Sequence, residues 1–191
     1  MSQAPTAAIR PTLIIHAHPA QSRSQVTRAL LETLSSLPHT SVRSLYHLYP
    51  DFDIDIEAEQ HALRAVQNVI WLAPVHWYGV PSLLKHWIDN VLTYGWAYGR
   101  GGAALHGKNL WWVASAGADA REYSASGSHH RPFAEYIAPI QGIAEYCGMH
   151  WLPPFITHGM SQADAAQWQS TRAGLLAQAH RLLAERIGEA Q

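Results

Sequence analysis

Residues 12–34 read TLIIHAHPAQSRSQVTRALLETL, and the order of an apolar run, a polar loop and an amphipathic segment in this stretch decides the fold. Residues 13–15 are continuously apolar, which is typical of a parallel strand that is buried on both faces. Pro19 ends that strand, and apolar residues then recur at helical spacing from Val26 to Leu34. The stretch therefore predicts a strand, a short loop and a helix, which together begin a β-α-β unit.

The loop of this unit has the composition of an anion-binding site. Ser22 and Ser24 are favourable N-cap residues, and Thr27 adds a third hydroxyl within the first turn of the helix. The free N–H groups of that turn and the helix dipole both attract negative charge. We therefore predict that a phosphate binds at this helix N-terminus without the help of a lysine.

The rest of the chain repeats the alternation of strand and helix. Further strands are predicted at residues 40–45, 68–73, 109–115 and 150–156, and further helices at residues 57–66, 81–91, 133–146 and 164–187. Five strands that alternate with five helices predict an α/β fold with a parallel sheet and with helices on both of its faces. We expect a single domain over residues 11–191 and a disordered tail over residues 1–10.

The composition excludes several classes of protein. The 191 residues carry a formal net charge of −1, so nothing in the sequence predicts binding of nucleic acid or of an anionic membrane surface. No apolar run approaches the roughly 18 residues that span a membrane. The single cysteine, Cys147, rules out an internal disulfide and fits a reducing compartment. We expect a cytoplasmic protein, and its eight Trp residues favour contact with another subunit.

Three loops that follow strands carry the unusual residues, and they span residues 18–27, 74–78 and 115–130. In a parallel sheet, ligands bind beyond the carboxyl ends of the strands, at the point where the strand order reverses. A Walker loop is absent, and the glycine-rich residues 99–102 do not follow a strand as a dinucleotide fingerprint would. These observations favour a mononucleotide site in a flavodoxin-like sheet with the strand order 2-1-3-4-5.

Six motifs give the chain a family resemblance. They are His18-Pro19-x4-Ser24, YPDFD at 49–53, Pro74-x2-Trp77-Tyr78, LLKHWIDNVL at 83–92, GWAYG at 95–99 and YCG at 146–148. In this order they resemble the flavodoxin-like NAD(P)H:quinone oxidoreductases, and most closely the ancillary proteins of glutathione-regulated potassium-efflux systems. The resemblance runs from the first strand to Pro154. It implies a homodimer that binds FMN rather than FAD and transfers a hydride from NADH or NADPH to the flavin and then to a quinone.

The resemblance also assigns residues to the flavin site, position by position. It gives the flavin phosphate to His18, Ser24, Gln25, Val26 and Thr27, the edge of the flavin ring to Pro74, Val75, His76, Trp77 and Tyr78, and its pyrimidine end to Ser115, Ala116, Gly117 and Ala118. Two positions depart from the family. Thr27 stands where the family often has Asn, and residues 115–118 replace a Thr-Thr-Gly-Gly pattern. We expect the Cβ of Ala118 to crowd the ring and to weaken FMN binding.

Tyr123 and His129 fall where the family places a Tyr and a His beside the electron acceptor, so the resemblance makes them the catalytic pair. A histidine and a phenol can polarise a quinone carbonyl and supply its proton. Backbone N–H groups of residues 115–118 would stabilise the negative charge of a reduced flavin. Because nicotinamide and quinone would stack on the same flavin face, we predict ping-pong kinetics.

Two other functions remain open. The chain could serve as an ancillary subunit that docks on a membrane potassium-efflux antiporter and so lies at the inner face of the cell membrane, with reductase activity secondary. It could also be a flavodoxin-like domain that binds no flavin, in keeping with the altered turn at residues 115–118.

Metal sites are not predicted. His16 and His18 lie on one face of a strand, but no third ligand stands at a suitable spacing. The acidic residues from Asp51 to Glu57 alternate like the start of a calcium loop, but Ile56 occupies the required glycine position. We interpret this stretch as solvated acidic residues that cap the next helix.

Overall fold

One parallel sheet organises the computed structural model, which describes residues 8–20 and 23–184. Its strand order is β2-β1-β3-β4-β5, which confirms the predicted order 2-1-3-4-5. All neighbouring strands run parallel. The strands are β1 (Thr12–His16), β2 (Thr40–Ser44), β3 (Asn68–Pro74), β4 (Asn109–Ala116) and β5 (His150–His158).

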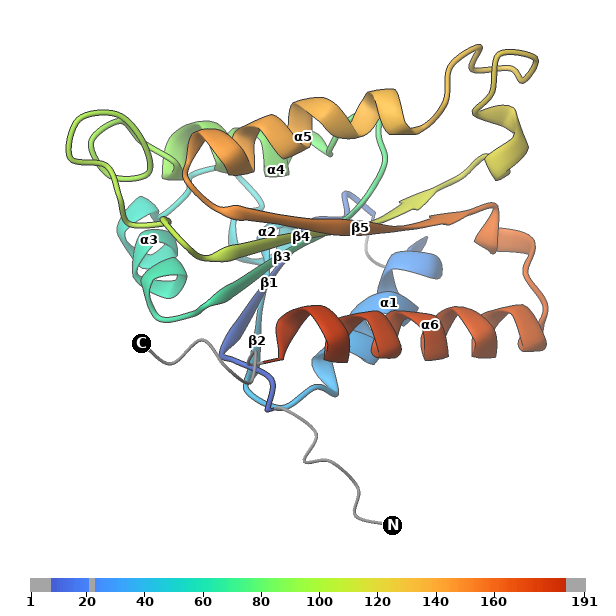
Figure 1. Ribbon diagram of the computed structural model, residues 1–191, viewed down its shortest axis with the longest axis horizontal. Helices are drawn as coiled ribbons and strands as arrows, with labels where there is room; N and C mark the ends of the chain where they lie inside the picture. Colours follow the sequence, from blue (N-terminus) through green and yellow to red (C-terminus); the bar gives the residue numbers. More distant parts are fainter. Residues whose placement is uncertain (1–7, 21–22, 185–191) are drawn as a thin grey trace.

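Helices cover both faces of the sheet, as Figure 1 shows, and each layer has its own apolar core. The first layer holds α3 (Ile56–Arg64), α4 (Ser82–Val91) and α5 (Ala134–Tyr146), and the second holds α1 (Val26–Ser35) and α6 (Ala165–Leu183). Every residue of β1 and β3 is buried, because these central strands are covered from both sides. This burial explains why their sequences are continuously apolar.

The alternation of side chains along β1 assigns each residue to one layer. Leu13 and Ile15 pack in the core below α3, α4 and α5, whereas Ile14 packs in the core below α1 and α6. His16 follows Ile14 at a spacing of two residues, so its side chain lies on the α1 face at the carboxyl end of the strand. In the sheet, His16 is paired with Ser44 of β2 and Leu72 of β3.

A buried carboxylate ties the first layer to the edge strand β2. Glu59 of α3 is fully buried and accepts hydrogen bonds from Arg43 Nε (2.5 Å), Tyr49 OH (2.5 Å) and Trp87 Nε1 (2.9 Å). Burial and the hydrogen bond to Glu59 raise the pKa of Tyr49 to about 12. Through the Glu59 side chain, the network joins β2 to α4 and also to Tyr49, which precedes α3 in the chain.

The end of the second strand and the end of the last helix both differ from the sequence prediction. The second strand ends at Ser44 rather than at residue 45, because Leu45 begins the short helix α2 (Leu45–Leu48), which was not predicted. The last helix ends at Leu183 rather than at residue 187. Ala184 adopts an extended conformation and forms an antiparallel bridge with Ile9, and the residues after it lie outside the described part.

Ile9 and Arg10, which the sequence analysis assigned to a disordered tail, are ordered in the structure. Ile9 is buried in the α1 and α6 layer, and the N–H of Arg10 donates to the carbonyl oxygen of Leu183 (3.1 Å). The apolar side chain of Ile9 gains burial by pairing with the end of α6, so the ordered chain begins before residue 11. The first seven residues of the expected tail lie outside the described residues.

Candidate functional site

The carboxyl ends of β1, β3 and β4 bring together the three loops that the sequence singled out. Thr27 Oγ1 in α1 lies 3.3 Å from Ser115 Oγ in β4. The N–H of Val75 donates to the carbonyl oxygen of Ser115 (2.9 Å), which joins the loop after β3 to the same strand end. The candidate phosphate, ring and pyrimidine segments therefore share one edge of the sheet.

The start of α1 differs in detail from the predicted cap. The helix begins at Val26, and the residue in the cap position is Gln25, which makes no side-chain hydrogen bond to the helix. Ser24 is buried, and its hydroxyl accepts from the N–H of Arg28 (3.2 Å). Ser24 therefore satisfies one N–H donor of the first turn, although it stands one residue before the cap position. Ser22, the other predicted cap, lies outside the described residues.

His18 and His76 lie in the loops that follow β1 and β3. His18 Nδ1 accepts from the N–H of Ala20 (3.1 Å), which orients the ring. Burial lowers the pKa of His18, and the nearby charge of His76 lowers it further. The loop after β1 therefore presents a neutral imidazole ring at neutral pH.

The loop after β3 forms a tight turn with unusual backbone angles. His76 and Gly79 exchange two backbone hydrogen bonds (3.1 and 3.0 Å) around Trp77 and Tyr78, whose φ angles are +47° and +64°. Positive φ at both central positions defines a type I′ turn, which normally favours Asn and Gly. Trp77 is also 94% exposed, so an unfavourable backbone holds a large aromatic ring in solvent at the candidate site.

We expect the variant Trp77→Asn to be more stable than the wild type by about 1 kcal/mol, because Asn tolerates a left-handed backbone and the exposed indole contributes little packing. Urea unfolding followed by circular dichroism would measure the difference. Tyr94→Asn is the matched control, since Tyr94 is also exposed but has no positive φ. Equal or lower stability of Trp77→Asn would mean that the turn is not strained.

The predicted catalytic residues lie in one aromatic cluster. The rings of Tyr123 and His129 are stacked with their centroids 4.2 Å apart. His129 Nδ1 lies 3.4 Å from the hydroxyl oxygen of Tyr78, whose ring stacks on Tyr136 at 4.8 Å. Burial raises the pKa of the Tyr123 hydroxyl, and Tyr136 and Tyr78 raise it further. The cluster therefore joins the loop after β3 to the loop after β4.

Three members of this cluster were missed by the sequence analysis: Phe133, Tyr136 and His158. His158 ends β5, and its ring packs against Tyr123 and Phe133 at centroid distances of 5.3 and 5.1 Å. Burial lowers the pKa of His158, and its contact with the Ala118 backbone partly opposes that shift. A polar residue at the carboxyl end of a parallel strand is the signal that could have found His158.

The turn after β4 leaves room beside its backbone. A Cβ added to Gly117 would meet no atom within 4 Å, so packing within the described chain does not require glycine there. The N–H of Gly159 donates to the carbonyl oxygen of Ala116 (3.1 Å) and anchors the turn to the end of β5. The open backbone fits a ligand that approaches closely. With the hydroxyls of Ser24 and Thr27, it offers hydrogen-bonding groups of the kind that bind a phosphate at this edge.

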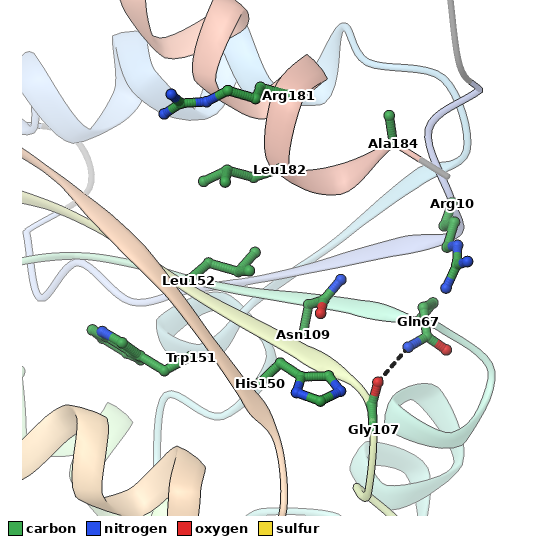
Figure 2. Close-up of a pocket in the computed structure, with 10 residues that line it drawn as sticks. All are labelled: Arg10, Gln67, Gly107, Asn109, His150, Trp151, Leu152, Arg181, Leu182 and Ala184. Carbon is green, nitrogen blue, oxygen red and sulfur yellow. Dashed lines mark hydrogen bonds between the residues drawn. The ribbon is translucent and has the colours of Figure 1, made fainter. Parts of the chain in front are cut away.

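A separate cavity of about 420 Å³ lies at the opposite edge of the sheet, near the amino ends of β4 and β5. Figure 2 shows that the guanidinium groups of Arg10 and Arg181 lie on different sides of this cavity. Gln67 Nε2 donates to the carbonyl oxygen of Gly107 (2.7 Å) at its rim. Because the two cations do not converge on one point, this cavity is a poorer candidate than the carboxyl edge.

Comparisons with known proteins agree with this geometry. A family model described as "Flavodoxin-like fold" matches residues 10–180. The glutathione-regulated potassium-efflux system ancillary protein KefF of Salmonella typhi is 51% identical over 146 residues, which are 76% of this chain and 82% of that protein.

Two solved structures extend the likeness. General stress protein 14 of Treponema denticola in complex with FMN is 37% identical, with a TM-score of 0.83 over 89% of this chain and 98% of that chain. An NADPH-quinone reductase from P. pentosaceus is 28% identical, with a TM-score of 0.79 over 93% and 99%. In the described part of the chain, no helix combines the length and apolar character that crossing a membrane requires.

Proposed function

Since this chain belongs to the family with the flavodoxin-like fold, we propose that it is an FMN-dependent NAD(P)H:quinone oxidoreductase. The observation that carries the proposal is the meeting of a hydroxyl-lined helix N-terminus and an aromatic cluster with a histidine at one edge of the sheet. Likeness to a protein solved with FMN and to one named as an NADPH-quinone reductase supports it.

The residues at the start of α1 would hold the cofactor by its phosphate. Ser24 and Thr27 supply hydroxyls, His18 supplies an imidazole, and the first turn of α1 supplies N–H groups. Backbone N–H groups of residues 115–118 would face the pyrimidine end of the flavin. FMN supplies the chemistry of accepting and releasing a hydride, and the protein supplies orientation and fixed dipoles.

His129 and Tyr123 would act on the acceptor. An incoming quinone needs a proton on each reduced oxygen, and an imidazole such as that of His129 can deliver one. The hydroxyl of Tyr78 lies 3.4 Å from His129 Nδ1 and can orient the ring, which would leave Nε2 available to the acceptor. Nicotinamide and quinone would use the same space in turn, and initial rates should therefore give parallel double-reciprocal lines.

The first test is a visible spectrum after incubation with FMN and desalting, followed by NADPH or NADH without oxygen. Retained flavin bands that bleach with either nicotinamide, and return with a quinone, are expected. In His129→Gln, bleaching should continue, whereas reoxidation by quinone should slow by roughly 100-fold because proton delivery is lost. His130→Gln is the matched control, since the neighbouring exposed ring makes no contact with Tyr123 among the described residues. Absence of retained flavin would refute the proposal.

A second candidate function is suggested by the relatives named as ancillary proteins of a potassium-efflux system. The chain would then dock on the cytosolic part of an antiporter and lie at the inner face of the membrane through that partner. Co-purification with the cytosolic domain of such an antiporter tests this function. Loss of co-purification in a variant of the exposed residue Phe52, with quinone turnover unchanged, would mean that docking and catalysis both operate on one protein.

We also propose a homodimer. Tyr94 and Tyr146 are 67% and 72% exposed, and both pack on Tyr98 with ring centroids 6.0 and 5.1 Å away. Exposed aromatic side chains that gather over α5 and the loop after α4 are typical of subunit contacts.

A further inference from the structure

We propose that His16 binds the phosphate group of the flavin mononucleotide as a hydrogen-bond donor, so that the site selects FMN over unphosphorylated riboflavin. This inference rests on the proposed function, because it names a further residue of the same cofactor site. The motifs shared with the quinone oxidoreductases assign His18 and leave His16 without a role.

His16 ends the strand that leads into the candidate phosphate loop, which begins two residues later at His18. It is the last residue of β1, and the alternation of side chains along the strand puts it on the same face as Ile14, which packs in the core below α1 and α6. On that face, Thr27 in the first turns of α1 reaches Ser115 at the end of β4, so α1 begins over the strand ends. Burial lowers the pKa of His16, and the nearby charge of His18 lowers it further.

Among the described residues, one ring nitrogen of His16 has a hydrogen-bond partner and the other has none. Nδ1 lies 2.9 Å from Ser44 Oγ at the end of β2. Nε2 is buried and has no hydrogen-bond partner among the described residues, although the side chain is only 4% exposed. A buried polar group without a partner costs about 1–3 kcal/mol, so such groups are rare unless a ligand or a bound water completes them.

The direction of the hydrogen bond between Ser44 and Nδ1 determines whether Nε2 carries a proton. When Ser44 donates its hydroxyl hydrogen to Nδ1, the single proton of the neutral ring must sit on Nε2. Burial keeps the ring neutral, because it lowers the pKa of His16 to about 4. In this tautomer Nε2–H is an uncharged donor at neutral pH, and a phosphate oxygen is a strong acceptor for it.

Other buried nitrogens without described partners do not fit this role. Trp71 and Trp112 lie within the core on the α3, α4 and α5 face, and Trp96 packs against the same core. His158 lies in the aromatic cluster at the acceptor end of the site. His16 alone among these groups stands on the α1 face at the end of a strand that leads into the phosphate loop.

The test compares FMN and riboflavin binding by quenching of flavin fluorescence, in the wild type and in His16→Phe. The wild type should prefer FMN. His16→Phe should bind FMN about 10- to 100-fold more weakly, because a hydrogen bond to a charged group is lost, and its riboflavin affinity should change by less than about threefold. His150→Phe is the matched control, since His150 is exposed at the opposite edge of the sheet.

A second variant keeps the test decisive where His16→Phe fails to fold. Ser44→Ala leaves the ring in place but removes the group that fixes its tautomer, so the preference for FMN over riboflavin should fall about threefold or more. In NMR spectra, the Nε2–H resonance of His16 should shift on adding FMN and stay in place on adding riboflavin.

The experiment distinguishes a failure of the role proposed for His16 from a failure of the proposed reductase function. An unchanged ratio of FMN to riboflavin affinity in folded His16→Phe, or in Ser44→Ala, would overturn the role of His16 while leaving the reductase proposal intact. A wild type that binds neither flavin would overturn both.

Discussion

Replacing Glu59 with leucine should lower the free energy of unfolding by about 3–5 kcal/mol, because the change leaves a partly buried guanidinium without its carboxylate. The Arg43 side chain is only 25% exposed, whereas the Glu59 side chain has no exposure at all. Two further donors, Tyr49 OH and Trp87 Nε1, would also lose their acceptor. Leucine has a similar volume, so the loss would reflect the broken network rather than a large cavity.

Urea unfolding followed by tryptophan fluorescence would measure this loss. The matched control is Glu57→Leu, because Glu57 is exposed on the same helix and should change stability by less than about 0.5 kcal/mol. Glu59→Gln keeps the shape but removes the charge, so it should fall between the wild type and Glu59→Leu. A loss below about 1 kcal/mol in Glu59→Leu would contradict a stabilising role for the carboxylate.

The sequence did not predict this network, for a physical reason. Glu59 follows the acidic residues 51–57, and acidic residues are almost always exposed unless they are paired. Its partners Arg43, Tyr49 and Trp87 come from three different elements, and no local spacing relates them. The local part of the prediction was correct, since Asp55 caps α3 by accepting from the N–H of Ala58 (3.0 Å).

The fold itself was predictable, because its signals are local and repeated. Continuous apolar runs identified the buried strands β1 and β3, and strand–helix alternation identified a parallel sheet. The helix α2 has four residues, which is too short for a helical period to register. The end of α6 depends on the pairing of Ala184 with Ile9, which is a contact between opposite ends of the chain.

The candidate site was likewise predicted only in part from the sequence. Its place at the carboxyl ends of the strands follows from topology, and the loops found by sequence do meet there. The positive φ of Trp77 and Tyr78 could not be read from residue type, because these side chains disfavour that conformation. Nor could the free nitrogen of His16, since its state depends on Ser44, which lies 28 residues away.

The second prediction with a large expected effect is a loss of stability at acidic pH, which depends on the lowered pKa of His16. In the unfolded chain, a histidine binds its proton near pH 6.5, whereas burial lowers the pKa of folded His16 to about 4. Below pH 6.5 the unfolded state therefore binds more protons than the folded state. The stabilising contribution is complete above pH 6.5 and is lost progressively as the pH falls to about 4, by about 3 kcal/mol in all.

Unfolding free energies of the flavin-free protein, measured by urea titration between pH 7 and pH 4, would reveal this loss as a slope. His18 and His158 also have lowered pKa values and act in the same direction, so the comparison of the wild type with His16→Phe isolates the contribution of His16. The variant should have a clearly smaller slope, whereas exchange of the exposed His150 for Phe should leave it unchanged. Equal slopes in the wild type and His16→Phe would mean that His16 takes up its proton at the same pH in the folded and unfolded states. A ring that stays neutral below pH 6.5 requires the steeper slope of the wild type, because the folded state then binds fewer protons than the unfolded state.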